Sequence, residues 1–188
     1  MNTVNKSLKY NTIYVDTPNK DLDEYLTELL EEPIFTMVDT NAILAMWSPL
    51  PKLRERMRIM ELWGFKYATL LNWRKSSDLD NGYWYRGNCE PLLIGSRGIT
   101  DVSSLTKHNL IACSEENRNY KPLMIRHMIS MAAKNSFAIP VKLDLWSAYW
   151  QAEYNDYHPG SWLTLGTRDL WVEYLSKHVD RINPNSVK

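Results

Sequence analysis

The sequence predicts an α/β fold in which a mainly parallel sheet is flanked by helices. Stretches of strand periodicity alternate along the chain with stretches of helical periodicity, as expected of such a fold. The strand-like stretch 41–47 is a nearly continuous apolar run, which indicates a strand buried on both faces. A length of 188 residues suits one domain with a full core, so we expect a single domain over residues 1–188.

Two short apolar runs near the start of the chain predict strands, at 11–15 and 41–47. Between them, leucines at helical spacing predict a helix over 20–32. Asn19 is a suitable N-cap for this helix, and Pro33 marks its end.

A second helix is expected over 49–64, where Gly64 stands in a C-cap position. The strand-like stretch 66–75 follows it, and 76–82 is expected to be a loop. The side chains of the second helix that should face the core are Leu50, Leu53, Met57 and Met60, with its arginines facing outward.

The second half of the chain continues the alternation of strands and helices. The stretch 90–96 predicts a strand, 98–108 a polar loop and 109–113 a short strand. Pro122 opens a helix that runs to about Lys134, because proline is common at the first helical position. The remaining elements are a last core strand at 141–146, a loop leading to 161–166, and a final helix at about 168–180.

The charge balance excludes a strongly basic, sequence-blind nucleic-acid binder. Formal net charge is zero and the isoelectric point is about 6.9, so any contact with nucleic acid must be local. Residues 16–32 are rich in acids and residues 52–75 are rich in bases. These clusters are either two solvated helix faces or, for the basic one, a ledge for phosphate.

The two cysteines, Cys89 and Cys113, have no CxxC spacing and no nearby histidine, which favours a reduced, intracellular and cytoplasmic protein. Neither a long apolar run nor a signal-peptide pattern is present, so we expect no membrane association. No cluster of His, Cys and Asp has metal-ligand spacing, and we expect no metal.

Five blocks of sequence, in this order and spacing, carry a resemblance to one known family. They are "WGFKY" (63–67), "NGYWYRGNCEPLLIGSRG" (81–98), "YKP" (120–122), "KLDLW" (142–146) and "PGSWLTLG" (159–166). The chain resembles the N(6)-adenine methyltransferases typified by the catalytic subunit of the messenger-RNA adenine methyltransferase, which have small bacterial and phage relatives. The resemblance implies a Rossmann-like fold that binds S-adenosylmethionine (SAM) in permuted order. The catalytic loop is then near the amino terminus and the SAM strand near the carboxyl terminus.

The catalytic side of the resemblance centres on the end of the first strand. The family has DPPW there: its carboxylate accepts a hydrogen bond from the adenine amine, its proline carbonyls orient that amine, and its aromatic ring stacks on the extruded base. In this chain Asp16, Thr17, Pro18 and Asn19 occupy these places, so Asp16 and Pro18 are the catalytic candidates. The candidates for contact with the substrate are Asn19, Trp84 and Arg86, and Trp47 or Trp84 could supply the missing ring.

The cofactor side of the resemblance involves Asp16 and four further positions. Lys121, followed by proline, matches the lysine that contacts SAM, and its ammonium can reach the methionine carboxylate. Asp144 matches an acidic strand residue that can accept hydrogen bonds from ribose hydroxyls. Thr167 and Arg168 stand where the family has an Asn-Gln or Asn-Glu pair that holds the adenosine.

The same residues have plainer readings. Lys121 could be a solvated residue before a helix, Asp144 a strand-edge acid facing water, and Glu90, shared with the family, a structural residue. The aromatic run that includes Trp84 could be core or interface.

Two main hypotheses of function follow from the resemblance. The first is SAM-dependent methyl transfer to the exocyclic amine of adenine in nucleic acid, with DNA favoured over RNA, in the cytoplasm of a bacterium or of a phage host. The second is a catalytically inactive relative that binds nucleic acid or supports a homologous, active partner subunit. Asn19 and the short segment after it favour inactivity, whereas Lys121 and Asp144 favour activity. A third possibility is another SAM-dependent modification of a base or small molecule.

Overall fold

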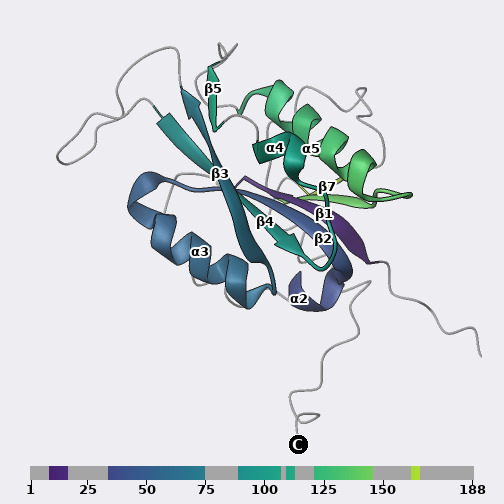
Figure 1. Cartoon of the computed structure of the whole chain (residues 1–188). Helices are drawn as coiled ribbons and strands as arrows, with labels where there is room; N and C mark the ends of the chain where they lie inside the picture. Colours follow the sequence, from purple (N-terminus) through teal and green to yellow (C-terminus); the bar gives the residue numbers. More distant parts are fainter. Residues whose placement is uncertain are drawn as a thin grey trace, which may run out of the picture.

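A computed structural model of the chain describes residues 9–16, 34–74, 89–106, 109–112, 121–145 and 162–165. These residues form a seven-stranded sheet with helices on both faces (Figure 1). The strands are β1 (Tyr10–Val15), β2 (Val38–Trp47), β3 (Lys66–Arg74), β4 (Cys89–Arg97), β5 (Leu110–Ala112), β6 (Lys142–Leu145) and β7 (Trp162–Leu165). The helices are α2 (Ile34–Met37), the 3-10 turn η1 (Leu50–Lys52), α3 (Leu53–Leu62), α4 (Ser103–Thr106) and α5 (Leu123–Ser136).

The sheet is mostly parallel, which confirms the predicted α/β class. Its strand order is β5-β3-β4-β2-β1-β6-β7. Strand β1 pairs in parallel with both β2 and β6, β6 pairs in parallel with β7, and β3 pairs in parallel with β5. Strand β4 runs antiparallel between β2 and β3.

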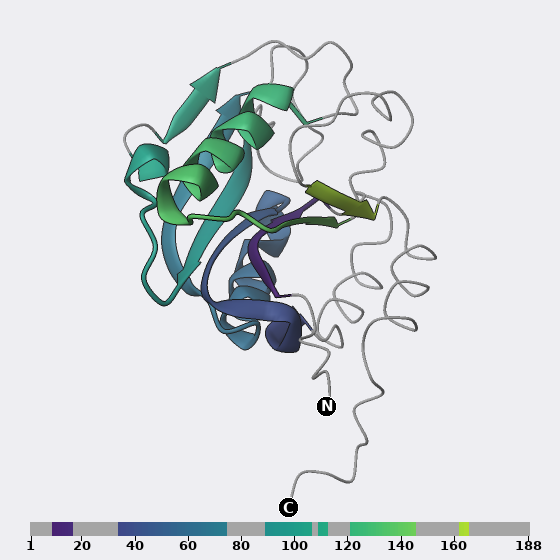
Figure 2. The same cartoon turned by 90° about the vertical axis from the view of Figure 1, so that its right-hand side faces the viewer.

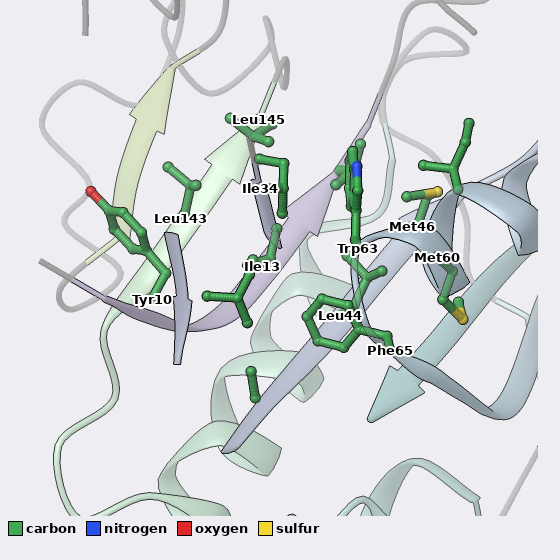
Figure 3. Packing of buried hydrophobic residues seen from close by; sticks show 14 of the residues in the cluster. Tyr10, Ile13, Ile34, Leu44, Met46, Met60, Trp63, Phe65, Leu143 and Leu145 are labelled. Carbon is green, nitrogen blue, oxygen red and sulfur yellow. The ribbon is translucent and has the colours of Figure 1, made fainter. Parts of the chain in front are cut away.

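Alternation along the central strands divides the core into two layers, because successive side chains point to opposite faces of a sheet. In β1, Ile13 and Val15 face one layer and Tyr14 faces the other. The first layer packs against α3, where Ile59 and Met60 close it, and Figure 3 shows its side chains. The second layer packs against α5, which lies on the opposite face of the sheet from α3 (Figure 1).

The predicted strands of the described residues are all present, within one to three residues at their ends. The apolar run predicted at 41–47 lies within β2, whose last six residues are all buried, as expected of a strand covered on both faces. The segment 161–166 holds β7, which pairs with β6, so the predicted strand at 141–146 is followed by one more strand.

The predicted second helix begins as η1 and continues as α3, and its buried face differs from the prediction. Leu50, expected in the core, is 54% exposed, whereas Arg56, expected in solvent, is fully buried. The face of α3 that packs on the sheet runs through Arg56, Ile59 and Met60, at helical spacing. Leu50 lies in the separate 3-10 turn and is therefore out of phase with this stripe.

Two other boundaries differ from the sequence predictions. The polar stretch predicted as a loop contains α4, which starts where the Asp101 carboxylate accepts a hydrogen bond from the Ser103 amide, at 2.9 Å. A single helical turn is too short to show periodicity in the sequence. The predicted helix opening at Pro122 is α5, which begins one residue later because Pro122 has an extended ψ of 129°. Gly64 has the positive φ expected after the end of α3.

Several expected elements lie outside the described residues, namely the helices at 20–32 and 168–180 and the loop at 76–82. Among the helices of the described residues, none is long and apolar enough to span a membrane.

Candidate functional site

The carboxyl ends of β1 and β6 mark a topological switch point in the sheet. The chain leaves β1 for β2 on one side, and it leaves β6 for β7 on the other side, while β1 and β6 are parallel neighbours (Figure 2). In open α/β sheets, ligands bind in the crevice at such a point. Asp16 is the first residue after β1, and its backbone amide donates to the Leu145 carbonyl oxygen at 3.1 Å, which joins the two strand ends.

Four side chains from different elements meet at this edge. Lys121, which precedes α5, places its Nζ 3.8 Å from Asp16 Oδ1 and forms a salt bridge with Glu90 of β4. The same Nζ lies 5.0 Å from the centre of the Trp47 ring, at the end of β2. The Lys121 side chain is only 10% exposed and that of Asp16 is 20% exposed. The largely buried Lys121 ammonium therefore lies close to the carboxylates of Asp16 and Glu90 and to the face of the Trp47 ring.

The register of the strands explains why these groups face the same way. Tyr14 and Trp47 both belong to the layer under α5, and the Trp47 Nε1–H donates to the Tyr14 hydroxyl at 2.6 Å. Trp47 also packs edge to face against Trp73, with ring centres 5.9 Å apart. Lys121 thus lies over a Trp47 ring that is itself held by contacts with Tyr14 and Trp73.

The environment of Asp16 raises the pKa of its carboxyl group to near neutral pH. Burial raises the pKa of Asp16 from 3.8 to about 7, and the carboxylates of Glu90 and Asp144 add to this rise. Lys121 and, more weakly, Arg56 oppose it by favouring the ionised carboxylate. A carboxyl group with this pKa can gain or lose a proton near neutral pH, as a general base requires.

Asp144 lies close to this cluster but is engaged differently from the expectation. Its side chain is completely buried on the α5 side of β6, so the reading as an acid facing water is wrong. The Arg126 Nη2 atom of α5 lies 2.8 Å from Asp144 Oδ2. The carboxylate that the resemblance assigns to ribose is thus ion-paired inside the protein.

Three charged side chains near the site were not predicted as part of it. Glu90 was expected only as a structural residue, and neither Arg126 nor Arg56 was singled out. Burial lowers the pKa of Arg56 to about 10, while Asp16 opposes this change. An arginine in phase with the apolar stripe of α3 was the available signal for Arg56, whereas the pairing of Arg126 depends on the fold and has no local signal.

The exposed basic residues of α3 lie elsewhere. A shallow groove on the solvent side of this helix is lined by Leu50, Arg54, Arg58 and Leu62, among others. Arg56 belongs to the predicted basic cluster but is buried, so it cannot contribute to a phosphate ledge there.

The other candidate residues lie outside the described residues. They are Thr17, Pro18, Asn19, Trp84, Arg86, Thr167 and Arg168. No group of His, Cys, Asp and Glu side chains within the described ranges could hold a metal ion.

Comparison with known proteins adds no assignment. No protein-family profile matches the chain, and no curated protein sequence matches it.

Proposed function

We propose that this chain transfers a methyl group from SAM to the exocyclic amine of adenine in nucleic acid, with DNA favoured over RNA. The observation that carries the proposal is the position of the Asp16 carboxylate. It lies at the switch point of the sheet, partly accessible and 3.8 Å from the Lys121 ammonium. These are the two residues that the family resemblance assigns to base and donor.

The order of the strands supports a Rossmann-like methyltransferase fold in permuted order. The acid after the first strand and the acid of β6, far apart in the sequence, lie on adjacent parallel strands, with Tyr14 opposite Asp144 in the register. A permuted chain brings its amino-terminal catalytic loop and its carboxyl-terminal cofactor strand together in this way.

The described residues fit one end of SAM and not the other. The Lys121 ammonium suits the methionine carboxylate, because a charge-assisted hydrogen bond can form there. Asp144 does not fit a ribose in its present position, since it is buried and paired with Arg126. When bound, SAM would supply an activated methyl group.

Asp16 would act on the amine of the base. Its ionised carboxylate accepts a hydrogen bond from the amine and orients the nitrogen lone pair, worth about 1.5–3 kcal/mol. Methyl transfer to this nitrogen would break the sulfonium–methyl bond of SAM, leave S-adenosylhomocysteine and release one proton of the amine. A carboxylate with a pKa of about 7 can accept this proton at neutral pH.

The test is methylation of mixed DNA and RNA by the full chain with labelled SAM, with 6-methyladenine measured by nucleoside mass spectrometry. Asp16→Ala should reduce the product to background, and Lys121→Met should raise the SAM concentration needed. Lys66→Met, which removes an exposed lysine from the far end of β3, is the matched control and should leave the reaction unchanged. Unchanged methylation by Asp16→Ala would refute the catalytic role of this carboxylate.

The second candidate is a catalytically inactive subunit with the same fold. Asn19 in place of the stacking ring favours it, since a stacked aromatic is worth about 1–3 kcal/mol per base. The ion pair that occupies Asp144 favours it as well. Asn19→Trp distinguishes the two: it should raise methylation if the missing ring limits an otherwise competent site, and it should have no effect on an inactive subunit.

A further inference from the structure

We infer that Arg126 and Asp144 are positioning residues, whose buried ion pair holds the start of α5 so that Lys121 stands between Asp16 and Glu90. This inference rests on the proposed function, but the role it gives Asp144 differs from the ribose contact implied by the resemblance. Asp144 would hold Arg126 in place and would not bind the ligand itself.

The ion pair is a direct tether between α5 and the sheet. Arg126 Nη2 and Asp144 Oδ2 lie 2.8 Å apart, and their side chains are 2% and 0% exposed. In a buried pair, loss of one partner leaves a charge without compensation, whereas replacement of both partners by apolar side chains is often tolerated. The helix should therefore keep its position when both charges are present or when both are replaced by apolar side chains. It should lose this position when only one charge is left.

The surroundings of Arg126 restrict its position further. Its guanidinium lies 4.7 Å from the centre of the Trp162 ring in β7, and the ammonium of Lys142 lies 5.3 Å from the same ring. Lys142 also donates to the Ser130 hydroxyl of α5 at 2.7 Å. The Arg126–Asp144 ion pair and the Lys142–Ser130 hydrogen bond thus link α5 to β6, and both basic groups also lie against the Trp162 ring of β7.

The tether is connected to Lys121 by a short and stiff piece of chain. The ring of Pro122 fixes its φ at −59°, and the Ile125 amide donates to the Pro122 carbonyl oxygen at 3.0 Å, at the start of the helix. Arg126 follows at once in the same helix. A shift of Arg126 would therefore be transmitted to Lys121, whose Nζ must remain within reach of two carboxylates.

A positioning role and a ligand contact make opposite predictions for Arg126. If Asp144 bound ribose, Arg126 would compete with the ligand, and Arg126→Met would leave affinity unchanged or increase it. If the pair positions Lys121, Arg126→Met must weaken binding as much as Asp144→Leu does. The double variant should then recover, because neither charge is left alone.

The experiment measures the affinity of S-adenosylhomocysteine for four full-length proteins by calorimetry. These are the wild type, Arg126→Met, Asp144→Leu and the double variant, with Arg54→Met as a control that removes an exposed charge from α3. We expect each single variant to bind about tenfold more weakly or worse, because small displacements of a binding group are costly, and the double variant to return towards wild type. Equal loss in the double variant and in Asp144→Leu, with Arg126→Met unimpaired, would overturn the inference.

A second measurement does not depend on the proposed function. Acetylation of lysines followed by mass spectrometry reports the accessibility of Lys121 relative to the exposed Lys66. Lys121 should react faster in both single variants and at the wild-type rate in the double variant; unchanged reactivity in folded single variants contradicts the positioning role.

If the wild type binds no S-adenosylhomocysteine, the proposed function fails while this measurement still decides the inference. Should the single variants not fold, the double variant still tests the inference, since faster acetylation of Lys121 there would contradict it.

Discussion

The Asp16 side chain makes the folded state sensitive to pH. Its pKa is 3.8 in the absence of perturbation and about 7 in the folded protein, mainly because of burial. Between these values the folded state binds more protons than the unfolded state, so stability falls as pH rises. The free energy of unfolding should therefore lose about 4 kcal/mol from this group between about pH 4 and pH 7, and change little from it above pH 7.

Asp16→Asn removes this titration and should stabilise the protein at pH 8. An amide of the same shape avoids the burial of a charge, so we expect a gain of up to about 4 kcal/mol at pH 8 and none at pH 4. Urea unfolding at several pH values measures it. Asp39→Asn, at the opposite end of the sheet, is the matched control for the replacement of an acid by its amide. An Asp16→Asn variant less stable than the wild type at pH 8 would contradict a raised pKa.

Single residues at the site were only partly predictable from the sequence. Asp16 and Lys121 were expected near each other, and the structure brings them together. The partners of Asp144 and Glu90 could not be predicted, because Arg126 and Lys121 reach them from elements remote in sequence. Local patterns report which face of an element is apolar, and they carry no information on which charges meet across a core.

At the scale of elements, the two glycines of the "GSRG" segment serve packing and a turn. A side chain at Gly95 would press against Met60 and Phe65, so this glycine allows α3 to lie close to β4. Gly98 has a φ of +65° at the end of β4, and a Cβ there would collide with Asn41 and with the backbone of Thr40. The segment that contributes to the family resemblance is therefore explained by the sheet and its covering helix.

Gly98→Ala should destabilise the turn between β4 and α4. The left-handed backbone and the collision with the Thr40 carbonyl oxygen together predict a loss of about 1–3 kcal/mol in the free energy of unfolding. Denaturant unfolding measures the loss, with Ser96→Ala, two residues earlier in β4, as the control. A loss of less than about 0.5 kcal/mol would mean that the chain can relax around the new methyl group.

Elements that are long and periodic were predicted well, and short or interrupted ones were not. The apolar strand β2 was identified because burial on both faces leaves a continuous run. Helix α4 has only four residues, and the break between η1 and α3 changes the phase of the buried stripe. Such irregularities depend on contacts of single residues, such as the Asp101 cap, and leave no periodic trace.

For the whole molecule, strand order was the property that sequence could not supply. The class follows from the alternation of elements, but the antiparallel insertion of β4 between β2 and β3 depends on connections and packing across the sheet. This order places β1 near the middle and leaves β5 and β7 at the two edges. Asp16, at the end of β1, is two strands from the β7 edge and four from β5, and the site extends through Trp47 of β2 to Glu90 of β4.

This asymmetry predicts the pattern of amide hydrogen exchange. Amides of β1 and β2 should exchange only through global unfolding, because both strands are paired on each side and buried. At S-adenosylhomocysteine concentrations 100 times the Kd, these amides should slow by about 100-fold, since a ligand that binds only the folded state stabilises it by about 2.7 kcal/mol. Mass spectrometry of exchanged peptides measures both effects.

The two edge strands then act as internal controls for the location of the ligand. Edge amides exchange by local opening, so they slow only where the ligand blocks that opening. Strand β7 and the start of α5 should gain protection, because they adjoin β6 and Lys121, whereas β5 should exchange as before. Protection of β5 with none at β7 would place the ligand at the opposite edge, and the assignment of the switch point between β1 and β6 would then be wrong.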